Sequence, residues 1–266
     1  HTAVDRQVTN VAAGTEDTDA VNKAQLDAVA ANLADANDYY AANGADDGSD
    51  ASAAVGTNSV AAGSYAAAIG NDSTAVGSAS TAAGNESATF GVRSNALGNM
   101  TTAMGANSFA MNDGATAVGY GTTALGAYSF AGGYGAATAG QYDVAIGYQS
   151  MADYGGWNVT IGAFTYSLGA GVAIGYNAKA YGASSVSVGF NSKNAGAYAV
   201  SMGWAANAAD AYATAVGAGS FADAWMASAF GVNAWAGRQS VALGSNAKAR
   251  GGYTVAIGEM ASATGQ

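Results

Sequence analysis

The stretch STAVGSASTAAGNESATFG, residues 73–91, contains the pattern that decides the fold. Glycine stands at positions 77, 84 and 91, and the same seven-residue spacing continues through most of the chain after residue 55. A period of seven is also typical of coiled coils, but glycine costs a helix interior about 1 kcal/mol at each occurrence. These segments also lack the long apolar side chains that a coiled-coil seam needs. A helical interpretation of residues 51–266 therefore fails.

The residues that precede the glycines show that the full repeat is fourteen residues long. Every second glycine follows a bulky apolar residue, as at Ile174, Val188, Met202, Val216, Phe230, Leu243 and Ile257. One such residue per fourteen, flanked by small and polar residues, predicts short strands joined by glycine turns, with one coil per repeat. The predicted fold class is all-β, a β-solenoid. Residues 54–265 would form about fifteen coils, a rod on the order of 70 Å long.

Alanine recurs two residues before the glycines, which predicts a tight interior. A coil of fourteen residues is too thin to enclose a sizeable core. We therefore expect stacking along the axis and association between chains to supply the missing burial.

Charge and composition argue against several classes of function. The net charge is −10, and residues 1–50 carry ten acidic residues against Arg6 and Lys23, so no basic surface for nucleic acid is expected. With no cysteine and only His1 as histidine, we predict no cofactor, no metal site and no enzyme. An acyltransferase built on another kind of β-helix would conflict with both the period and the missing histidine. No apolar run is long enough to span a membrane. Because the repeats still run at residues 261–266, we expect a fragment of a longer protein.

Residues 21–43 have helical apolar spacing. The predicted seam of a short coiled coil is Asn22, Leu26, Val29, Leu33, Ala36 and Tyr40. Asp17, Thr18 and Asp19 are the candidate N-cap residues, and Asn43 with Gly44 would end the helix. So short a helix is marginal alone, so partner copies must hold it together.

Residues 6–26, RQVTNVAAGTEDTDAVNKAQL, resemble the neck of trimeric autotransporter adhesins, the YadA-like family, and the fourteen-residue repeats resemble its head. The resemblance implies a homotrimer of left-handed parallel β-rolls joined through the neck to a trimeric coiled coil. The expected boundaries are 1–20 for the neck, 21–43 for the helix, 44–53 for a junction loop and 54–266 for the head. It also implies display on the outer membrane of a Gram-negative bacterium, through a C-terminal anchor outside this sequence.

Two functions remain open at this stage. The first is an adhesin head that binds an extracellular-matrix protein such as collagen, fibronectin or laminin, or a solid surface. The second is a rigid spacer in a long fibre, with adhesion carried elsewhere.

Aromatic residues recur at the coil period and are the main candidates for an adhesive surface. The first aromatic column, one residue after the glycine, holds Tyr120, Tyr134, Tyr148, Tyr176, Phe190 and Trp204. The second aromatic column lies two residues after the seven-residue beat. It holds Tyr128, Tyr142, Tyr198 and Tyr212, and Trp157 if one inserted residue near Tyr154 is allowed. Positions fourteen apart stack along a solenoid, so each column is expected to be a row of rings. These rings either face a ligand or fill the space between subunits and over turns.

The sequence also contains four weaker motifs besides the aromatic columns. Asn58, Ser59, Val60, Ala61 and Gly63 approach a repeat wording that the family resemblance associates with collagen binding, although the coil needs the same residues for packing. Residues 150–171 break the period by one insertion and one deletion, which indicates a bulge or a functional loop. Residues 46–50 contain three aspartates, whose spacing favours a solvated junction over a Ca²⁺ loop. The Asn-X-Ser/Thr triplets at Asn71, Asn85, Asn99 and Asn158 follow from the repeat itself and are given no function.

Overall fold

The computed structural model describes residues 8–36 and 53–265. The chain divides by its internal contacts into two compact units, His1–Ala45 and Asp46–Gln266.

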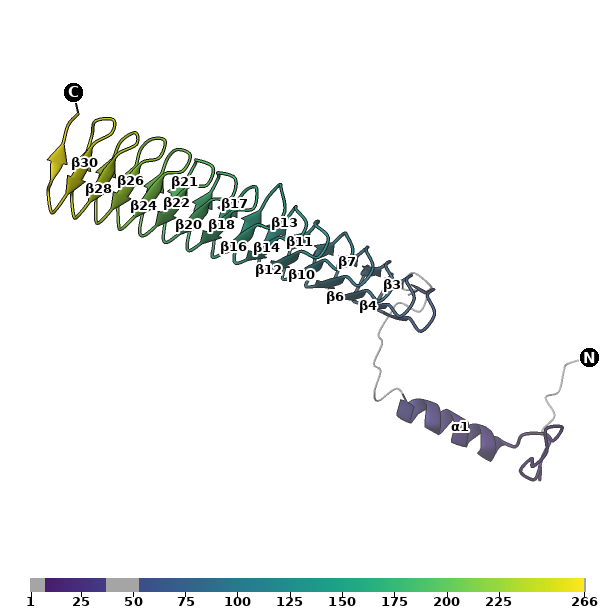
Figure 1. Ribbon diagram of the computed structural model, residues 1–266. Helices are drawn as coiled ribbons and strands as arrows, with labels where there is room; N and C mark the ends of the chain where they lie inside the picture. The colour runs from purple at the N-terminus through teal and green to yellow at the C-terminus, as the bar shows by residue number, and fades with distance from the viewer. Residues whose placement is uncertain (1–7, 37–52, 266) are drawn as a thin grey trace, which may run out of the picture. The chain divides into compact units, whose positions relative to one another are not determined.

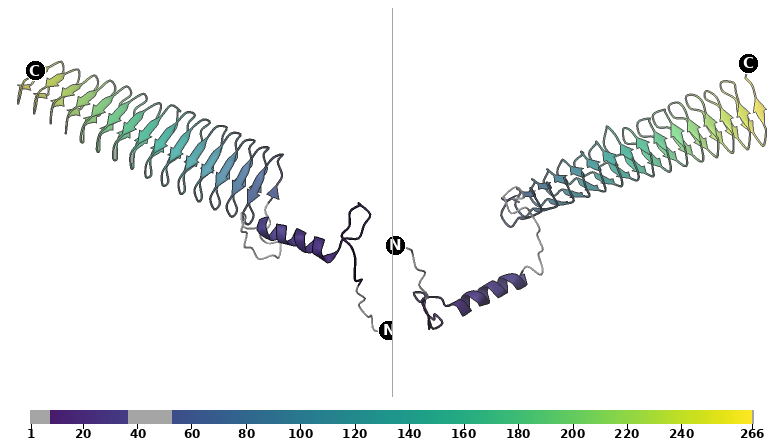
Figure 2. Two further views of the ribbon diagram at one scale, coloured as in Figure 1. Left: turned by 90° about the horizontal axis from the view of Figure 1, so that it is seen from below. Right: turned by 180° about the vertical axis from the view of Figure 1, so that it is seen from behind.

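The second unit is a stack of coils built from two parallel sheets (Figures 1 and 2). We call the first the long-strand sheet, because each of its strands has three residues. Its strands are β2(Val60–Ala62), β4(Thr74–Val76), β6(Ala88–Phe90), β8(Thr102–Met104), β10(Thr116–Val118), β12(Phe130–Gly132), β14(Val144–Ile146), β16(Val159–Ile161), β18(Val172–Ile174), β20(Val186–Val188), β22(Val200–Met202), β24(Thr214–Val216), β26(Ser228–Phe230), β28(Val241–Leu243) and β30(Val255–Ile257).

The short-strand sheet contains the two-residue strands. They are β1(Ala53–Ala54), β3(Ala67–Ala68), β5(Thr81–Ala82), β7(Asn95–Ala96), β9(Phe109–Ala110), β11(Thr123–Ala124), β13(Ala137–Thr138), β15(Met151–Ala152), β17(Tyr166–Ser167), β19(Lys179–Ala180), β21(Lys193–Asn194), β23(Asn207–Ala208), β25(Phe221–Ala222), β27(Trp235–Ala236), β29(Lys248–Ala249) and β31(Ser262–Ala263). Each strand pairs in parallel with the equivalent strand of the next coil, usually fourteen residues on, so Thr74 faces Ala88 and Thr81 faces Asn95. The predicted solenoid of fourteen-residue coils is confirmed.

Alanine fills the space between the two sheets. Successive side chains of a strand point to opposite faces. The middle residue of each long strand and the second residue of each short strand therefore point inward, as Ala75 and Ala82 do, and both are fully buried. The first and third residues of the long strands point outward. The alanine spacing is thus explained by an interior that admits only small side chains.

Each coil has two turns. The first turn, after a long strand, begins with a glycine, and the second, after a short strand, usually has a glycine in its second position. In both, the next-to-last residue has a positive φ, about +55° at Ala79 and Glu86, and the last is buried. Where the last residue is serine, its hydroxyl commonly donates to the glycine carbonyl, as Ser80 Oγ does to Gly77 at 2.8 Å and Ser87 Oγ to Gly84 at 2.6 Å.

The predicted break of the period is confirmed and lies entirely in the second turns. Val144 faces Val159, fifteen residues on, and Val159 faces Val172, thirteen residues on. The turn at 153–158 therefore has one extra residue, and the turn at 168–171 has one fewer. A second short turn at 237–240 brings Ser228 opposite Val241.

The first unit contains the helix α1(Lys23–Ala36), preceded by a looped segment. Its N-cap is Asn22, so the assignment of Asp17, Thr18 or Asp19 to that role is wrong. Asn22 Oδ1 accepts from the Gln25 backbone N–H at 3.0 Å, and Gln25 Oε1 accepts from the Asn22 N–H at 3.2 Å. This reciprocal capping box satisfies two N–H groups that a helix start leaves open. Asp19 instead closes the loop before the helix, accepting from the N–H groups of Thr15 and Glu16, and these bonds lower the pKa of its carboxyl.

The described residues include only part of the predicted coiled-coil seam. Leu26 and Val29 are exposed on the helix, and Leu33 and Ala36 lie in its last turns. Asn22 lies before the helix, where its Nδ2 also donates to the Val11 carbonyl at 3.2 Å. Tyr40, the predicted stop at Asn43 and Gly44, and the acidic segment 46–50 lie outside the described residues.

Candidate adhesive surface

The outer face of the long-strand sheet is apolar along the whole solenoid. Its third-position side chains are mostly exposed and bulky, including Phe90, Met104, Ile146, Ile161, Ile174, Met202, Phe230, Leu243 and Ile257. The first positions add valine or threonine in most coils. These are the bulky residues whose fourteen-residue spacing predicts the fold. So long a continuous apolar stripe exceeds what a monomeric surface normally exposes.

The first aromatic column exists as a row of rings on the first turns. The ring centroids of Tyr120, Tyr134 and Tyr148 lie 5.3 and 5.2 Å apart with planes within 15° of parallel. Tyr176 and Phe190 stack in the same way at 5.1 Å. Trp204 occupies the next coil and is 61% exposed.

Phe164 belongs to this column, although the sequence analysis missed it. Its ring packs edge to face with Tyr148 at 5.2 Å and with Tyr176 at 5.7 Å, and so fills the coil between them. Phe164 stands two residues after Gly162 instead of one, at the left-handed position of the turn. The 28-residue gap between Tyr148 and Tyr176 was the only signal for it.

The second aromatic column lies on the second turns and has two segments. Tyr128 and Tyr142 stack at 5.6 Å, and Trp157 follows at 4.5 Å, which confirms that the inserted residue shifts Trp157 into the column. Tyr198 and Tyr212 stack at 5.3 Å. Ala170 and Ser184 occupy the left-handed positions between the two segments.

An asparagine row precedes this second column on the same edge. The Oδ1 atoms of Asn71, Asn85 and Asn99 accept from backbone N–H groups one coil earlier, at 2.9 to 3.1 Å. The row ends at Asp113, whose Oδ1 accepts from the Asn99 N–H at 2.8 Å. These residues begin the first three Asn-X-Ser/Thr triplets, so the structure gives these triplets a structural role that the sequence did not suggest.

The irregular turn at 153–158 is held by two buried polar side chains, Asp143 and Asn158. Asp143 accepts from the N–H groups of Gly140 at 2.7 Å and Asn158 at 2.8 Å, and from Asn158 Nδ2 at 3.1 Å. Asn158 Nδ2 also donates to the Asp153 carbonyl, and its Oδ1 accepts from the Gly171 N–H at 3.0 Å. Burial raises the pKa of Asp143, although the hydrogen bonds it accepts act in the opposite direction. The two side chains thus tie together both of the irregular turns at 153–158 and 168–171.

The interior is polar in the same region. Ser150, Thr160 and Thr165 form a hydrogen-bonded group, with Oγ to Oγ1 distances of 2.7 and 2.8 Å. Further along, Ser187, Ser192 and Ser201 are linked in the same way, and Asn194 accepts from Ser185 Oγ at 2.8 Å. Hydroxyls thus replace part of the alanine core between residues 138 and 201, and most of them are hydrogen-bonded, although the buried Ser167 Oγ has no partner.

A cluster of tyrosine and lysine lies on the outer face of the short-strand sheet, beside the irregular turns. Tyr166 donates its hydroxyl to Asp153 Oδ2 at 2.8 Å, and its ring lies 5.3 Å from that of Tyr181. Burial and the Asp153 carboxylate raise the pKa of Tyr166 to about 12. Lys193 Nζ lies 5.7 Å from the Tyr181 ring centroid. Lys179 donates to the Phe164 carbonyl, and burial lowers its pKa.

The residues of the collagen-like motif occupy the same turn, strand and interior positions as the equivalent residues of other coils. Asn58 takes the left-handed turn position, and Ser59 Oγ donates to the Gly56 carbonyl at 2.6 Å. Val60 points outward, and Ala61 packs against the alanine core. Gly63, with φ +125°, begins the next turn. The structure therefore accounts for each residue of the motif by the needs of the coil.

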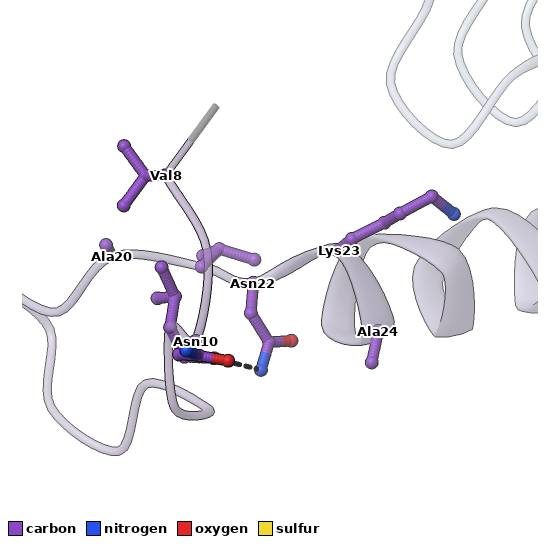
Figure 3. Close-up of a pocket in the computed structure, with 8 residues that line it drawn as sticks. Val8, Asn10, Ala20, Asn22, Lys23 and Ala24 are labelled. Carbon is purple, nitrogen blue, oxygen red and sulfur yellow. Dashed lines mark hydrogen bonds between the residues drawn. The ribbon is translucent and has the colours of Figure 1, made fainter. Parts of the chain in front are cut away.

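An open hollow lies beside the loop before α1 (Figure 3). It is lined mainly by apolar side chains, namely Val8, Val11, Ala20, Val21 and Ala24, with Asn10, Asn22 and Lys23. The Lys23 side chain extends away from the loop and pairs with Asp27.

Nothing in the described part of the chain gathers the ligands of a metal site: no three histidine, cysteine, aspartate or glutamate side chains group together there. None of the described helical residues forms a helix long and apolar enough to cross a membrane.

The chain is thus a β-solenoid that carries an apolar sheet face and two aromatic rows, preceded by a capped helix. Comparison with protein families gives two matches. Residues 7–49 match the coiled stalk of trimeric autotransporter adhesins. The YadA head domain repeat matches at residues 49–73, 68–88, 112–136, 170–192, 195–220, 226–247 and 236–259. These matches span more than half of the chain, which belongs to the trimeric autotransporter adhesins. A search of curated proteins found no match.

Proposed function

We propose that this chain is part of the passenger of a surface adhesin, and that its head binds an extracellular-matrix protein or a solid surface through the aromatic columns. Collagen, fibronectin and laminin are the matrix candidates. The observation that carries the proposal is the row of exposed rings on the first turns from Tyr120 to Trp204. Rings held by stacking lose little side-chain entropy on binding, and they supply contact area without charge.

The proposal includes a homotrimer in which the long-strand sheets face one another. Their apolar outer face extends over all fifteen coils of the sheet, and three copies around an axis would remove it from water. The first unit supports the same assembly. Leu26, Val29 and the apolar hollow beside the loop before α1 are exposed to solvent in the described part of the chain. Each ligand contact would then be present three times, so weak contacts would give strong attachment to a surface. The expected location is the outer surface of a Gram-negative bacterium.

A rigid spacer is the second candidate, and one observation favours it. The rings of each column stack on one another, and Tyr128 also covers the preceding turn, because a Cβ on Gly114 would lie 2.5 Å from its ring. Rings that cover turns stabilise the rod whether or not they meet a ligand. The two functions therefore predict different results for a folded variant that lacks a column: an adhesin head loses binding to its ligand, whereas a spacer has no such binding to lose.

The test is solid-phase binding to collagen, fibronectin, laminin and bare polystyrene. One variant replaces the first column by serine, at Tyr120, Tyr134, Tyr148, Phe164, Tyr176, Phe190 and Trp204. A second variant replaces the second column, at Tyr128, Tyr142, Trp157, Tyr198 and Tyr212, and shows which of the two columns carries the binding. Sedimentation first establishes that all forms remain trimers.

Loss of binding in a folded first-column variant supports the adhesive function. If the parent binds none of the surfaces, the spacer function is the correct one. If the seven-fold variant does not fold, Tyr134→Ser and Tyr148→Ser are tested singly, and unchanged binding in both contradicts the role of the first column.

A further inference from the structure

All the lysines of the solenoid lie on one face. Five basic residues follow residue 100, namely Lys179, Lys193, Arg238, Lys248 and Arg250. The three lysines occupy the outward first position of short strands, in β19, β21 and β29. Arg250 follows β29 directly, and Arg238 lies in the second turn after β27. The apolar long-strand sheet therefore carries none of these cations.

Lys179 and Lys193 form an uncompensated pair. They face each other in register on adjacent strands, about 4.8 Å apart along the sheet. Like charges placed directly opposite destabilise a sheet. Among the described residues the only ion pair is Lys23 with Asp27, so neither lysine has a carboxylate within 4.0 Å. Asp153, on the same face, already accepts hydrogen bonds from the Tyr166 hydroxyl and the Tyr154 N–H.

Both ammonium groups keep donors for a ligand. Lys179 Nζ uses one donor on the Phe164 carbonyl, and Lys193 Nζ lies near the Tyr181 ring and makes no hydrogen bond to the described residues. An ammonium has three N–H donors, so each lysine can still bind an anion. An anion bound between them would also relieve their mutual repulsion.

The two tyrosine rings beside the lysines do not stack in parallel, as most rings of the columns do. Stacked rings 5.1 to 5.3 Å apart cover each other's faces and present mainly their edges to solvent. The planes of Tyr166 and Tyr181 instead make an angle of 43°, and Tyr181 is 41% exposed. The hydroxyl of Tyr166 is held by Asp153, which fixes the ring. A partly exposed aromatic ring next to two cations, one of which lies over the ring, matches a ligand that is apolar on one side and anionic on another.

We propose that Tyr166, Tyr181, Lys179 and Lys193 form a binding site for a sulfated polysaccharide. A sugar ring packs its C–H groups against the exposed part of Tyr181, and sulfate groups accept hydrogen bonds from the two lysines. The positive charges of the two lysines complement the negative charges of a sulfated polysaccharide. The chain has a net charge of −10, so it does not gather polyanions by its overall field, and binding must come from this local pair. A nucleic acid would need a more extended basic surface than two lysines. The site is separate from the aromatic columns and does not depend on their adhesive role.

The test measures binding of the trimeric protein to immobilised heparin as the probe. Lys179→Gln with Lys193→Gln should weaken binding about tenfold or more, because charge-assisted hydrogen bonds are among the strong ones. The matched control, Lys248→Gln with Arg250→Gln, removes the same charge from β29 and the turn that follows it, and should change affinity less than about threefold. Lys179→Arg with Lys193→Arg should retain binding. Affinity should also fall as salt is raised.

Further arms separate the outcomes. Desulfated heparin should not bind, and polyglutamate should bind more weakly than heparin. Equal losses in both Gln variants, or equal binding of polyglutamate, would show general electrostatic attraction and overturn the proposal, as would absence of heparin binding. The first-column serine variant should keep its heparin binding, so failure of the aromatic columns as an adhesive surface is distinguishable from failure of this site.

Discussion

The two rows of turns that close the solenoid differ in how much variation they accept. Every first turn has four residues and begins with glycine, at φ between +118° and +141°. The second turns range from four to six residues, and among those of five residues Asn112, Asp210 and Ala224 stand in place of the glycine. One edge of the rod is therefore constant, and the other accommodates insertions, deletions and side chains.

Backbone conformation explains the difference. A φ near +128° is rarely adopted by a residue with a side chain, so glycine is required in the first turns whatever the space around it. The regular second-turn glycines have ordinary φ values and are limited by proximity alone. A Cβ on Gly84 would lie 1.8 Å from the Gly98 carbonyl oxygen, but beside Asn112 the nearest atom to a Cβ on Gly98 is 2.5 Å away. The spacing differs from coil to coil, because a Cβ on Gly196 would lie only 1.9 Å from the Asp210 carbonyl carbon.

The largest expected effect compares Gly133→Ala in a first turn with Gly126→Ala in a second turn. Gly133 has φ +120°, so alanine there combines a strained backbone with a Cβ 2.6 Å from the Gly147 oxygen. We expect the free energy of unfolding to fall by about 3–5 kcal/mol for Gly133→Ala and by about 1–3 kcal/mol for Gly126→Ala. Thermal and chemical denaturation of the trimers measure both. Equal losses would contradict the distinction between the two edges.

The second prediction concerns the six-residue turn. Asn158→Ala removes the bonds to the Asp153 carbonyl and the Gly171 N–H, and leaves the buried Asp143 with fewer donors. We expect a loss of about 3 kcal/mol in unfolding free energy. Ser87→Ala in a regular turn removes one hydrogen bond to the Gly84 carbonyl, so it is the control and should cost about 1 kcal/mol. A loss at Asn158 no greater than at Ser87 would mean that the longer turn needs no such anchor.

The third prediction is a pH dependence located at the same turn. The folded pKa of Asp143 is raised by burial, so the unfolded state loses this proton at lower pH than the folded state does. The stability contributed by the protonated carboxyl is complete below the unfolded pKa of about 3.8, and it is lost as pH rises through the folded value. Melting temperatures of the parent and Asp143→Asn against pH isolate this group. The parent should gain stability relative to the variant as pH falls through that window, and a constant difference would contradict the burial effect.

The smallest effect tests the left-handed positions on the two edges. Ala205 has φ +52°, a conformation that asparagine tolerates better, so Ala205→Asn in a first turn should stabilise by about 0.5–1 kcal/mol. Tyr212 has φ +59°, but its ring stacks on Tyr198, so Tyr212→Asn should lose about 0.5–1.5 kcal/mol of stacking and show no net gain. Denaturation midpoints give both values. A gain at Tyr212 would show that its ring does not stabilise the rod.

Much of the solenoid could be predicted because its information is local. Glycine at 77 and 91 marks successive first turns, and alanine at 75 and 82 must point inward because strand side chains alternate. The rings of Tyr120 and Tyr134 stack because they are one coil apart. The N-cap was misassigned because several acidic and hydroxyl residues precede the helix, and only the reciprocal bonds of Asn22 and Gln25 distinguish among them.

The sequence by itself determined the coil, its period, its small interior and the two aromatic columns, because each follows from the spacing of residues along the chain. The tertiary structure decided which residues become neighbours where the spacing changes. Strand pairing aligns equivalent positions of successive coils even where a turn has gained or lost a residue. This alignment places Phe164 in the first column and brings Asp143 within hydrogen-bonding distance of Asn158. The tertiary structure also decided that Lys179, Lys193, Tyr166 and Tyr181 share one outward face, since that depends on which of the two sheets each residue enters.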